Sequence, residues 1–329
     1  MTFATHPAAT LPAPRSSVKY LPVNLFAAVM GLSGLSMAWR GAGTAYGVSP
    51  VIGDAVGVVA VIAFLVLAAG YLAKWLRYPD AVRAEFSHPV ARNFFGTIAI
   101  AILLLSSVVG AHHKSLGQAL WTLGSVITVA LAFVIAGRLL HGRTEAANVV
   151  PAWLIPGVAT LDIAVAGGTM PMAWAREVNL LAVGVGTMIA LVFFTMIIAR
   201  LIRHDPLPAG MVPSLIILIA PFEVGFLAYV NVTGRVDMFA GMLFYSGLFL
   251  FVLLSWRVFR RPAPFAPSWW AISFPMAALS NAALAYAGQG QSAVLTWLAG
   301  LILLMLTAAI AVLFVRTLHS LFTHRLLAG

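Results

Sequence analysis

Apolar runs of about 17 to 22 residues recur along this 329-residue chain from end to end. A run of that length, wound as an α-helix, matches the roughly 30 Å hydrocarbon core of a lipid bilayer. The composition agrees, since 62% of the residues are hydrophobic and only 9% are charged, against roughly a quarter charged in soluble domains. The sequence therefore predicts an all-α integral membrane protein without a large soluble domain.

Ten of these runs are predicted to be transmembrane helices. They are Leu21–Trp39, Val56–Leu76, Phe94–Gly110, Leu116–Ala136, Trp153–Gly167, Val178–Ala199, Met211–Val232, Met238–Trp256, Trp269–Ala287 and Val294–Val315. The membrane domain is expected to cover 21–315, between a disordered cytoplasmic tail at 1–20 and a short basic cytoplasmic tail at 316–329. The first twenty residues lack an apolar core beside their basic residues, so they are not expected to be a cleavable signal.

The distribution of lysine and arginine tests this count, because cytoplasmic loops of membrane proteins are enriched in both. With ten spans, fifteen of the nineteen basic residues fall on one side of the membrane. The four on the other side are Arg40, Lys114, Arg176 and Arg235. Both termini are therefore predicted to be cytoplasmic, with the protein in the inner (plasma) membrane. Topology and contact with anionic lipid then explain the net charge of +10, and no nucleic-acid partner is expected.

Prolines divide the ten runs into two sets. Pro22, Pro89, Pro151, Pro213 and Pro267 recur near the cytoplasmic start of the odd runs, 67, 62, 62 and 54 residues apart. Pro156, Pro221 and Pro275 interrupt odd runs further along, whereas the even runs have no internal proline. A proline frees a backbone carbonyl, which is tolerated where the helix faces protein or a watery cavity. The pattern predicts five helical hairpins, with odd helices inside and even helices against lipid. Pore kinks are the first interpretation of Pro156, Pro213, Pro221 and Pro275, and ordinary packing kinks are the alternative.

Four stretches carry a resemblance to a known family. They are SWWAISFPMAALSNAALAYA at 268–287, EFSHPVARNFF at 85–95, LPVNLFAAVMGLSGLSMAW at 21–39 and IPGVAT at 155–160. In them the chain resembles the tellurite-resistance/C4-dicarboxylate transporter family, which includes the bacterial TehA proteins and the plant guard-cell slow anion channels. The resemblance extends over nearly the whole membrane region.

The resemblance implies a quasi-fivefold bundle with five inner helices around a central pore and five outer helices, assembled as a homotrimer with one pore per protomer. It also implies that a phenylalanine of the ninth helix plugs the pore, and the matching residue is Phe274, directly before Pro275. An aromatic ring on a kinked helix can close a narrow tube, and a change of rotamer would open it. Without the resemblance, Phe274 would be interpreted as a core residue. Phe26 and Phe95, within the matching stretches, are further candidates for the pore lining.

Two acidic residues do not fit a simple anion pore. Asp162 lies near the middle of the fifth run and Glu223 near the middle of the seventh. An ionisable side chain at that depth costs roughly 2.5 to 3.5 kcal/mol on insertion scales, so such residues usually face a cavity or a partner. Two interpretations stay open: a pH-sensing group in the pore, which gates or couples transport to protons, and a protonated carboxyl bonded to a neighbouring helix.

Transport of small inorganic or organic anions is the function that these features favour. Passive conduction through a phenylalanine-gated pore is the first hypothesis, because the repeats are parallel hairpins and no arginine lies inside the predicted spans. A proton-coupled carrier of C4-dicarboxylates or tellurium oxyanions is the alternative. A membrane-embedded enzyme is disfavoured, since no GxSxG, HExxH or GxxxxGK[ST] motif is present. The chain has no cysteine and no histidine pair at metal-binding spacing inside a span, so no metal or other cofactor is expected.

Overall fold

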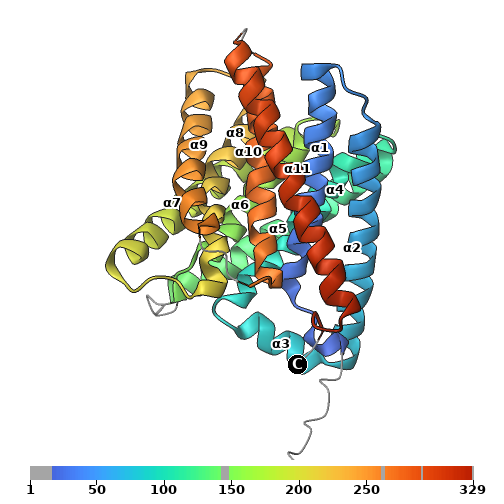
Figure 1. The fold of residues 1–329 in the computed structure, drawn as a ribbon, viewed down its shortest axis with the longest axis vertical. Coiled ribbons are helices and arrows are strands. Elements are labelled where there is room, and N and C mark those ends of the chain that lie inside the picture. Colours follow the sequence, from blue (N-terminus) through green and yellow to red (C-terminus); the bar gives the residue numbers. More distant parts are fainter. Residues whose placement is uncertain (1–16, 142–147, 261–263, 290–291, 328–329) are drawn as a thin grey trace, which may run out of the picture.

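The computed structural model describes residues 17–141, 148–260, 264–289 and 292–327, and within these residues it contains helices and turns but no strand (Figure 1). A long helix lies at each predicted apolar run. The bounds are α1 Phe26–Tyr46, α2 Val51–Arg77, α4 Gly96–Gly110, α5 Lys114–His141, α6 Ile155–Gly167, α7 Ala175–Arg203, α8 Ala220–Thr233, α9 Met238–Phe259, α10 Ser273–Ala287 and α11 Ala293–Phe322. A short helix, α3 (Pro79–Ser87), was not expected from the sequence.

Several of these helices are long and apolar enough to cross a membrane. Among the described residues, seven stretches meet both conditions: Val51–Arg77, Ala91–Gly110, Lys114–Gly137, Ala175–Arg203, Ala209–Thr233, Met238–Phe259 and Ala293–Phe322. Pro151–Gly167 is a shorter apolar helix. The chain is therefore an all-α, multi-span membrane protein.

Each odd-numbered run of the sequence prediction has a 3₁₀ segment at its start, before its α-helix begins. These segments are η2 Val23–Leu25, η3 Ala91–Phe95, η5 Pro151–Leu154, η6 Ala209–Ile219 and η7 Pro267–Ile272. The recurring prolines lie inside these segments or just before them. Proline has no N–H and clashes with the carbonyl four residues earlier, so regular α-helix is disfavoured there and short 3₁₀ turns take its place. The α-helix begins only after the 3₁₀ segment.

Pro156, Pro221 and Pro275 were predicted to interrupt their helices, but they lie near the start of them. All three lie in the first turn of an α-helix, in α6, α8 and α10 respectively. N–H groups of a first turn have no intrahelical partner, so proline removes no hydrogen bond there. The irregularity in each run is therefore the change from 3₁₀ to α geometry. Pro213 lies inside η6 itself.

The long helices pack as consecutive pairs: α1 with α2, α4 with α5, α6 with α7, α8 with α9, and α10 with α11. The first members, which we call the central helices (α1, α4, α6, α8 and α10), also contact one another in chain order, and α10 contacts α1. The second members expose large apolar side chains, such as Leu65 of α2 and Phe249 of α9. Only 17% of the apolar stretch of α2 is buried, against 67% for the stretch that contains α8. The central helices therefore form the core, and their partners present apolar surface outwards.

The described parts of the two expected tails contact each other. The Ser17 N–H donates to the Leu327 carbonyl (3.0 Å), and Val18–Tyr20 forms a 3₁₀ turn, η1. Helix α11 runs to Phe322, beyond the expected end of the membrane domain at Val315. The remainder of these tails, residues 1–16 and 328–329, lies outside the described residues.

Candidate functional site

A small apolar cavity lies where the first turns of the central helices converge. Each of these helices contributes to its lining: Met30 from α1, Ile100 from α4, Val158 from α6, Ala220 from α8 and Phe274 from α10. The cavity volume is about 30 Å³, and a water molecule needs roughly 10 to 15 Å³ of such space. This central cavity therefore holds no more than a few water molecules and is too small for a hydrated ion.

Phe274 belongs to the lining of the central cavity and is 7% exposed. The junction of η7 and α10 that carries it is fixed on two sides. The Trp270 indole N–H donates to the Thr317 hydroxyl of α11 (2.8 Å). The Ser273 hydroxyl lies 2.8 Å from the Trp270 carbonyl and 3.2 Å from the Ala27 carbonyl of α1, and it can donate to either. These contacts fix the backbone around Phe274, and the Phe274 side chain lies against the central cavity.

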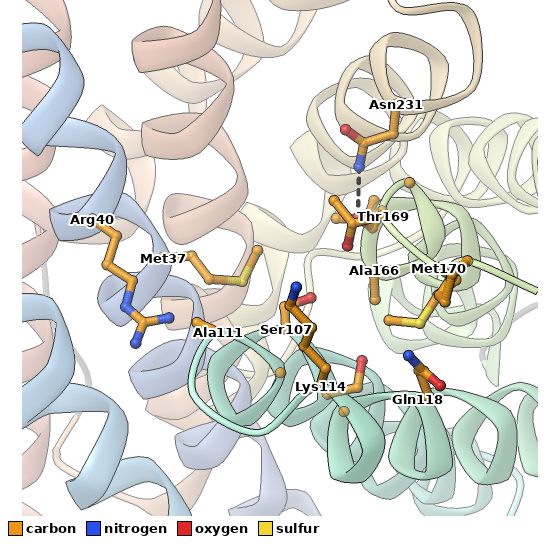
Figure 2. A pocket seen from close by; sticks show the side chains of 16 residues that line it. Met37, Arg40, Ser107, Ala111, Lys114, Gln118, Ala166, Thr169, Met170 and Asn231 are labelled. Atoms are coloured by element: carbon orange, nitrogen blue, oxygen red, sulfur yellow. Dashed lines mark hydrogen bonds between the residues drawn. The ribbon is translucent and has the colours of Figure 1, made fainter.

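A larger cavity of about 610 Å³, which we call the vestibule, lies at the opposite ends of the central helices (Figure 2). Met37 and Arg40 of α1, Ser107 of α4 and Val165 of α6 are part of its lining. Lys114 and Gln118 of α5, Thr169 and Asn231 add polar groups. The Asn231 amide donates to the Val165 carbonyl (2.6 Å), and so ties the end of α8 to the end of α6.

Arg40 has a structural role at the edge of the vestibule. Its Nε and Nη2 donate to Asp54 Oδ1 of α2 at 2.8 and 2.6 Å, and its Nη1 lies 3.4 Å from the Val108 carbonyl of α4. The His112 ring is also close, with Nε2 2.7 Å from Arg40 Nη2. Arg40 therefore joins the ends of three helices, and Asp54 balances its charge.

Asp162 lies on the face of α6 that connects the two cavities. Ile155 and Val158 line the central cavity, and Val165 lines the vestibule. Asp162 follows Val158 by four residues and precedes Val165 by three, and this spacing places all of them on one helix face. The side chain is 1% exposed, and its Oδ2 has no hydrogen-bond partner within the described part of the chain.

Glu223 faces a different neighbour. A methyl group added at Gly247 of α9 would overlap the Glu223 carboxylate, so this side chain lies in the contact between α8 and α9. It is fully buried, and neither carboxylate oxygen has a partner among the described residues. The structure brings Glu223 neither into the central cavity nor into the vestibule.

Phe26 and Phe95 also point away from the central cavity, Phe26 toward α2 and Phe95 toward α2 and α3. The Phe26 ring packs edge-on against Phe64 and Tyr71 of α2, with ring centroids 6.1 and 6.0 Å apart. The Phe95 ring packs against Tyr71 and against Phe86 of α3. Neither residue lines the central cavity, whereas Phe94, the neighbour of Phe95, does. Sequence reasoning missed Phe94, because the phase of the η3 turn decides which of two adjacent rings faces inwards.

A buried charge network fixes the start of α1, and sequence reasoning missed it as well. Lys74 Nζ of α2 donates to Glu85 Oε2 of α3 (2.7 Å) and to the Leu21 carbonyl (2.8 Å). Glu85 also accepts from the Val23 N–H (2.9 Å) and from the Tyr71 hydroxyl (2.9 Å). Two signals for it were present in the sequence, the position of Glu85 at the head of the stretch EFSHPVARNFF and the position of Lys74 inside the predicted span Val56–Leu76.

This combination of apolar helices, a narrow apolar cavity between the central helices and a larger vestibule with polar side chains is typical of a membrane channel or transporter. The profile of the voltage-dependent anion channel family, SLAC1, matches residues 20–318. The chain belongs to this family, and the resemblance read from its sequence is confirmed.

Individual relatives agree with this assignment. The chain is 28% identical over 275 residues to the S-type anion channel SLAH3 of Arabidopsis thaliana, which covers 81% of this chain and 43% of the plant protein. It is 26% identical over 269 residues to the tellurite resistance protein TehA homolog of Haemophilus influenzae, with 81% of both chains covered. It is also 26% identical over 241 residues to an uncharacterized transporter of Methanocaldococcus jannaschii, which covers 66% of this chain and 70% of the archaeal one.

Proposed function

We propose that this protein conducts small anions across the inner membrane of a cell through a pore between the central helices, closed by Phe274. The observation that carries the proposal is the central cavity, to which all five central helices contribute and which has room for only a few water molecules. Membership of the voltage-dependent anion channel family supports the anionic substrate. Anion current through the purified protein in a planar bilayer tests the proposal.

The proposed pore requires a particular arrangement of the helices. We infer that α1, α6 and α10 cross the membrane together with the seven stretches described above. The central helices then form a quasi-fivefold inner ring, and their pair partners form the outer ring. Contacts between α1 and α4, α4 and α6, α6 and α8, α8 and α10, and α10 and α1 support a closed ring. Both chain termini are cytoplasmic in this arrangement, as the lysine and arginine distribution predicts.

A coupled carrier is the second candidate, and Asp162 is the observation that favours it. A carboxyl group on the face between the two cavities, with an unpaired buried oxygen, is placed to bind and release a proton along the path of the substrate. The channel hypothesis comes first because the lining of the central cavity is apolar apart from Thr97 and offers an anion no set of binding groups.

Asp162→Asn is expected to remove a fall of anion conductance with rising pH. An ionised carboxylate in a narrow, poorly screened tube repels a passing anion much more strongly than it would in water. Conductance should therefore decrease as the pH rises through the titration of Asp162, and the asparagine variant should keep the higher conductance throughout. The measurement is the pH profile of the current in a Phe274→Ala background, where the Phe274 side chain no longer blocks the pore and so cannot mask the effect.

Glu223→Gln is the matched control for this prediction, because it neutralises a second buried carboxyl in the contact between α8 and α9. Its pH profile is expected to equal that of the background. If Glu223→Gln removes the pH dependence and Asp162→Asn does not, the pH response comes from Glu223 of α8, and the prediction for Asp162 of α6 is wrong.

A homotrimer with one pore per protomer is proposed from the family resemblance. The particle in mild detergent is expected to contain three times the 34.9 kDa of one chain. Gly241 and Gly247 of α9 face Tyr286 and Glu223 within the same chain, so subunit contacts must use other surfaces of the outer helices. Mass measurement by light scattering checks the prediction, and a monomeric or dimeric particle would contradict it.

A further inference from the structure

The vestibule has the size and polarity of a binding site for small solutes. Its volume of about 610 Å³ lies within the range of roughly 300 to 1,000 Å³ that is usual for ligand pockets. Two of its lining side chains, Arg40 and Lys114, are basic, and none is acidic. The net charge of the vestibule therefore depends on which of these two side chains forms an ion pair with an acidic residue.

Arg40 is balanced by Asp54, through the two hydrogen bonds to Oδ1 described above. The other acids near this end of the bundle are also engaged. Asp237 accepts from the Tyr229 hydroxyl (2.6 Å) and from the Ala240 N–H (3.1 Å) at the start of α9, and the Tyr229 bond in particular lowers the pKa of that carboxyl. Glu177 lies beside Arg176 on the surface. In the described ranges no acid forms an ion pair with Lys114, which is left as the unbalanced charge of the vestibule.

Two polar side chains accompany Lys114. Gln118 follows it by one helical turn on α5, so the two lie on the same face, and Ser107 comes from the facing helix α4. Figure 2 shows Lys114 and Gln118 directed from α5 toward the cavity, and Ser107 belongs to the same lining. Neither the Ser107 hydroxyl nor the Gln118 amide makes a hydrogen bond to another group in the described part of the chain. Three side chains that can donate hydrogen bonds, and that have no partner among the described residues, therefore line one cavity.

We propose that Lys114, Gln118 and Ser107 form a recruitment site for a small monovalent inorganic anion at the vestibule mouth of the pore. The inference rests on the proposed function and adds to it the residues that gather the substrate. An ammonium group attracts the anion, and a hydroxyl and an amide N–H replace part of its hydration shell. The wide cavity keeps the anion hydrated and weakly held, so it is concentrated without being trapped. Concentrating ions at a pore mouth raises the flux that enters from that side.

The test compares Lys114→Gln with the unmodified residue, both in the Phe274→Ala background, in planar bilayers with sodium chloride. At 10 mM salt, anion flux entering from the vestibule side is expected to fall about twofold to threefold, and about fivefold or more in Lys114→Glu, since one or two unit charges are changed within several ångströms of the path. At 1 M salt the screening length is only about 3 Å, so the difference should disappear. Flux in the opposite direction should change less.

Arg176→Gln is the matched control. It removes one positive charge at the same end of the bundle, from an exposed side chain that does not line the vestibule. The current should fall much less than in Lys114→Gln, although at 10 mM salt the screening length of about 30 Å lets a distant charge have a small effect. Equal currents with Lys114 and with its glutamine replacement at 10 mM salt would overturn the recruitment site while the proposed function stands. A loss that persists at 1 M salt, or that is equal in both directions, would also overturn it. If the Phe274→Ala background carries no anion current, the proposed function fails, and the recruitment site fails with it.

Discussion

Phe274→Ala is expected to raise the anion conductance of each protomer several-fold. The central cavity of about 30 Å³ is too small for a hydrated ion, and the Phe274 ring is the largest side chain that α10 places in its lining. Trp270 of the preceding segment η7 also belongs to the lining. Trp270 is fixed by its bond to Thr317, whereas no hydrogen bond restrains a phenylalanine ring. We expect removal of the ring to widen the central cavity along the proposed pore. Current per protein, measured in planar bilayers at one salt concentration, is the appropriate readout.

A second buried phenylalanine provides the control. Phe193 of α7 is 2% exposed and packs against Trp153, with ring centroids 5.7 Å apart, outside the lining of the central cavity. Phe→Ala in a core costs about 3 to 5 kcal/mol, so both variants should lose stability, and both must be shown to be folded before the currents are compared. Only Phe274→Ala should gain conductance. Wild-type current in a folded Phe274→Ala protein would place the closure at another residue.

Lys74→Ala is expected to have the largest effect on stability among single substitutions of charged residues. Lys74 is 4% exposed, and its removal leaves Glu85 without its cation and the Leu21 carbonyl without its donor. Breaking a buried ion pair from one side costs about 3 to 5 kcal/mol, because the remaining charge is no longer compensated. The free energy of unfolding in a mixed detergent titration measures this loss.

Two further variants separate the ion pair from a general loss of packing. Lys74→Met with Glu85→Gln removes both charges and keeps most of the volume, so much of the lost stability should return. Arg83→Ala breaks the Arg83–Asp80 pair, whose side chains are 80% and 92% exposed respectively, and it should leave the free energy of unfolding unchanged. A double variant as unstable as Lys74→Ala would show that packing, and not the uncompensated charge, is responsible.

The helices could be predicted from the sequence because the bilayer imposes their length and polarity. Helix α9 begins at Met238, where the apolar run begins, and α2, α5, α7 and α11 extend a few residues beyond their runs into charged or polar sequence. The central helices were harder to delimit. Hydropathy does not distinguish an apolar 3₁₀ turn from an apolar α-turn, so α8 begins at Ala220 although its run begins at Met211. Helix α3 was missed because it is amphipathic and only nine residues long, whereas the helices were predicted from apolar runs long enough to cross a bilayer.

The candidate site was predictable only in part, and for a different reason. Asp162 was found because an acid in an apolar run stands out in any sequence, and α-helical spacing then places it between the two cavities. Glu223 has the same signal, yet it faces Gly247 of α9, and the sequence does not encode which neighbour lies on that side. In the sequence, Lys114 stood out only as one of the four basic residues outside the loops that are predicted to be cytoplasmic. Its place in the vestibule depends on contacts between helices that are distant in the chain.

The reversal potential of the current through the Phe274→Ala protein tests the central proposal most directly. The bilayer separates two sodium chloride solutions that differ tenfold in concentration, at equal pH. Conduction of anions through an open pore predicts a reversal potential close to the chloride equilibrium potential, and it predicts a shift when chloride on one side is replaced by a large organic anion. A reversal potential close to that of sodium would contradict anion selectivity. One that follows an imposed pH gradient at equal chloride would contradict passive conduction and indicate a proton-coupled carrier.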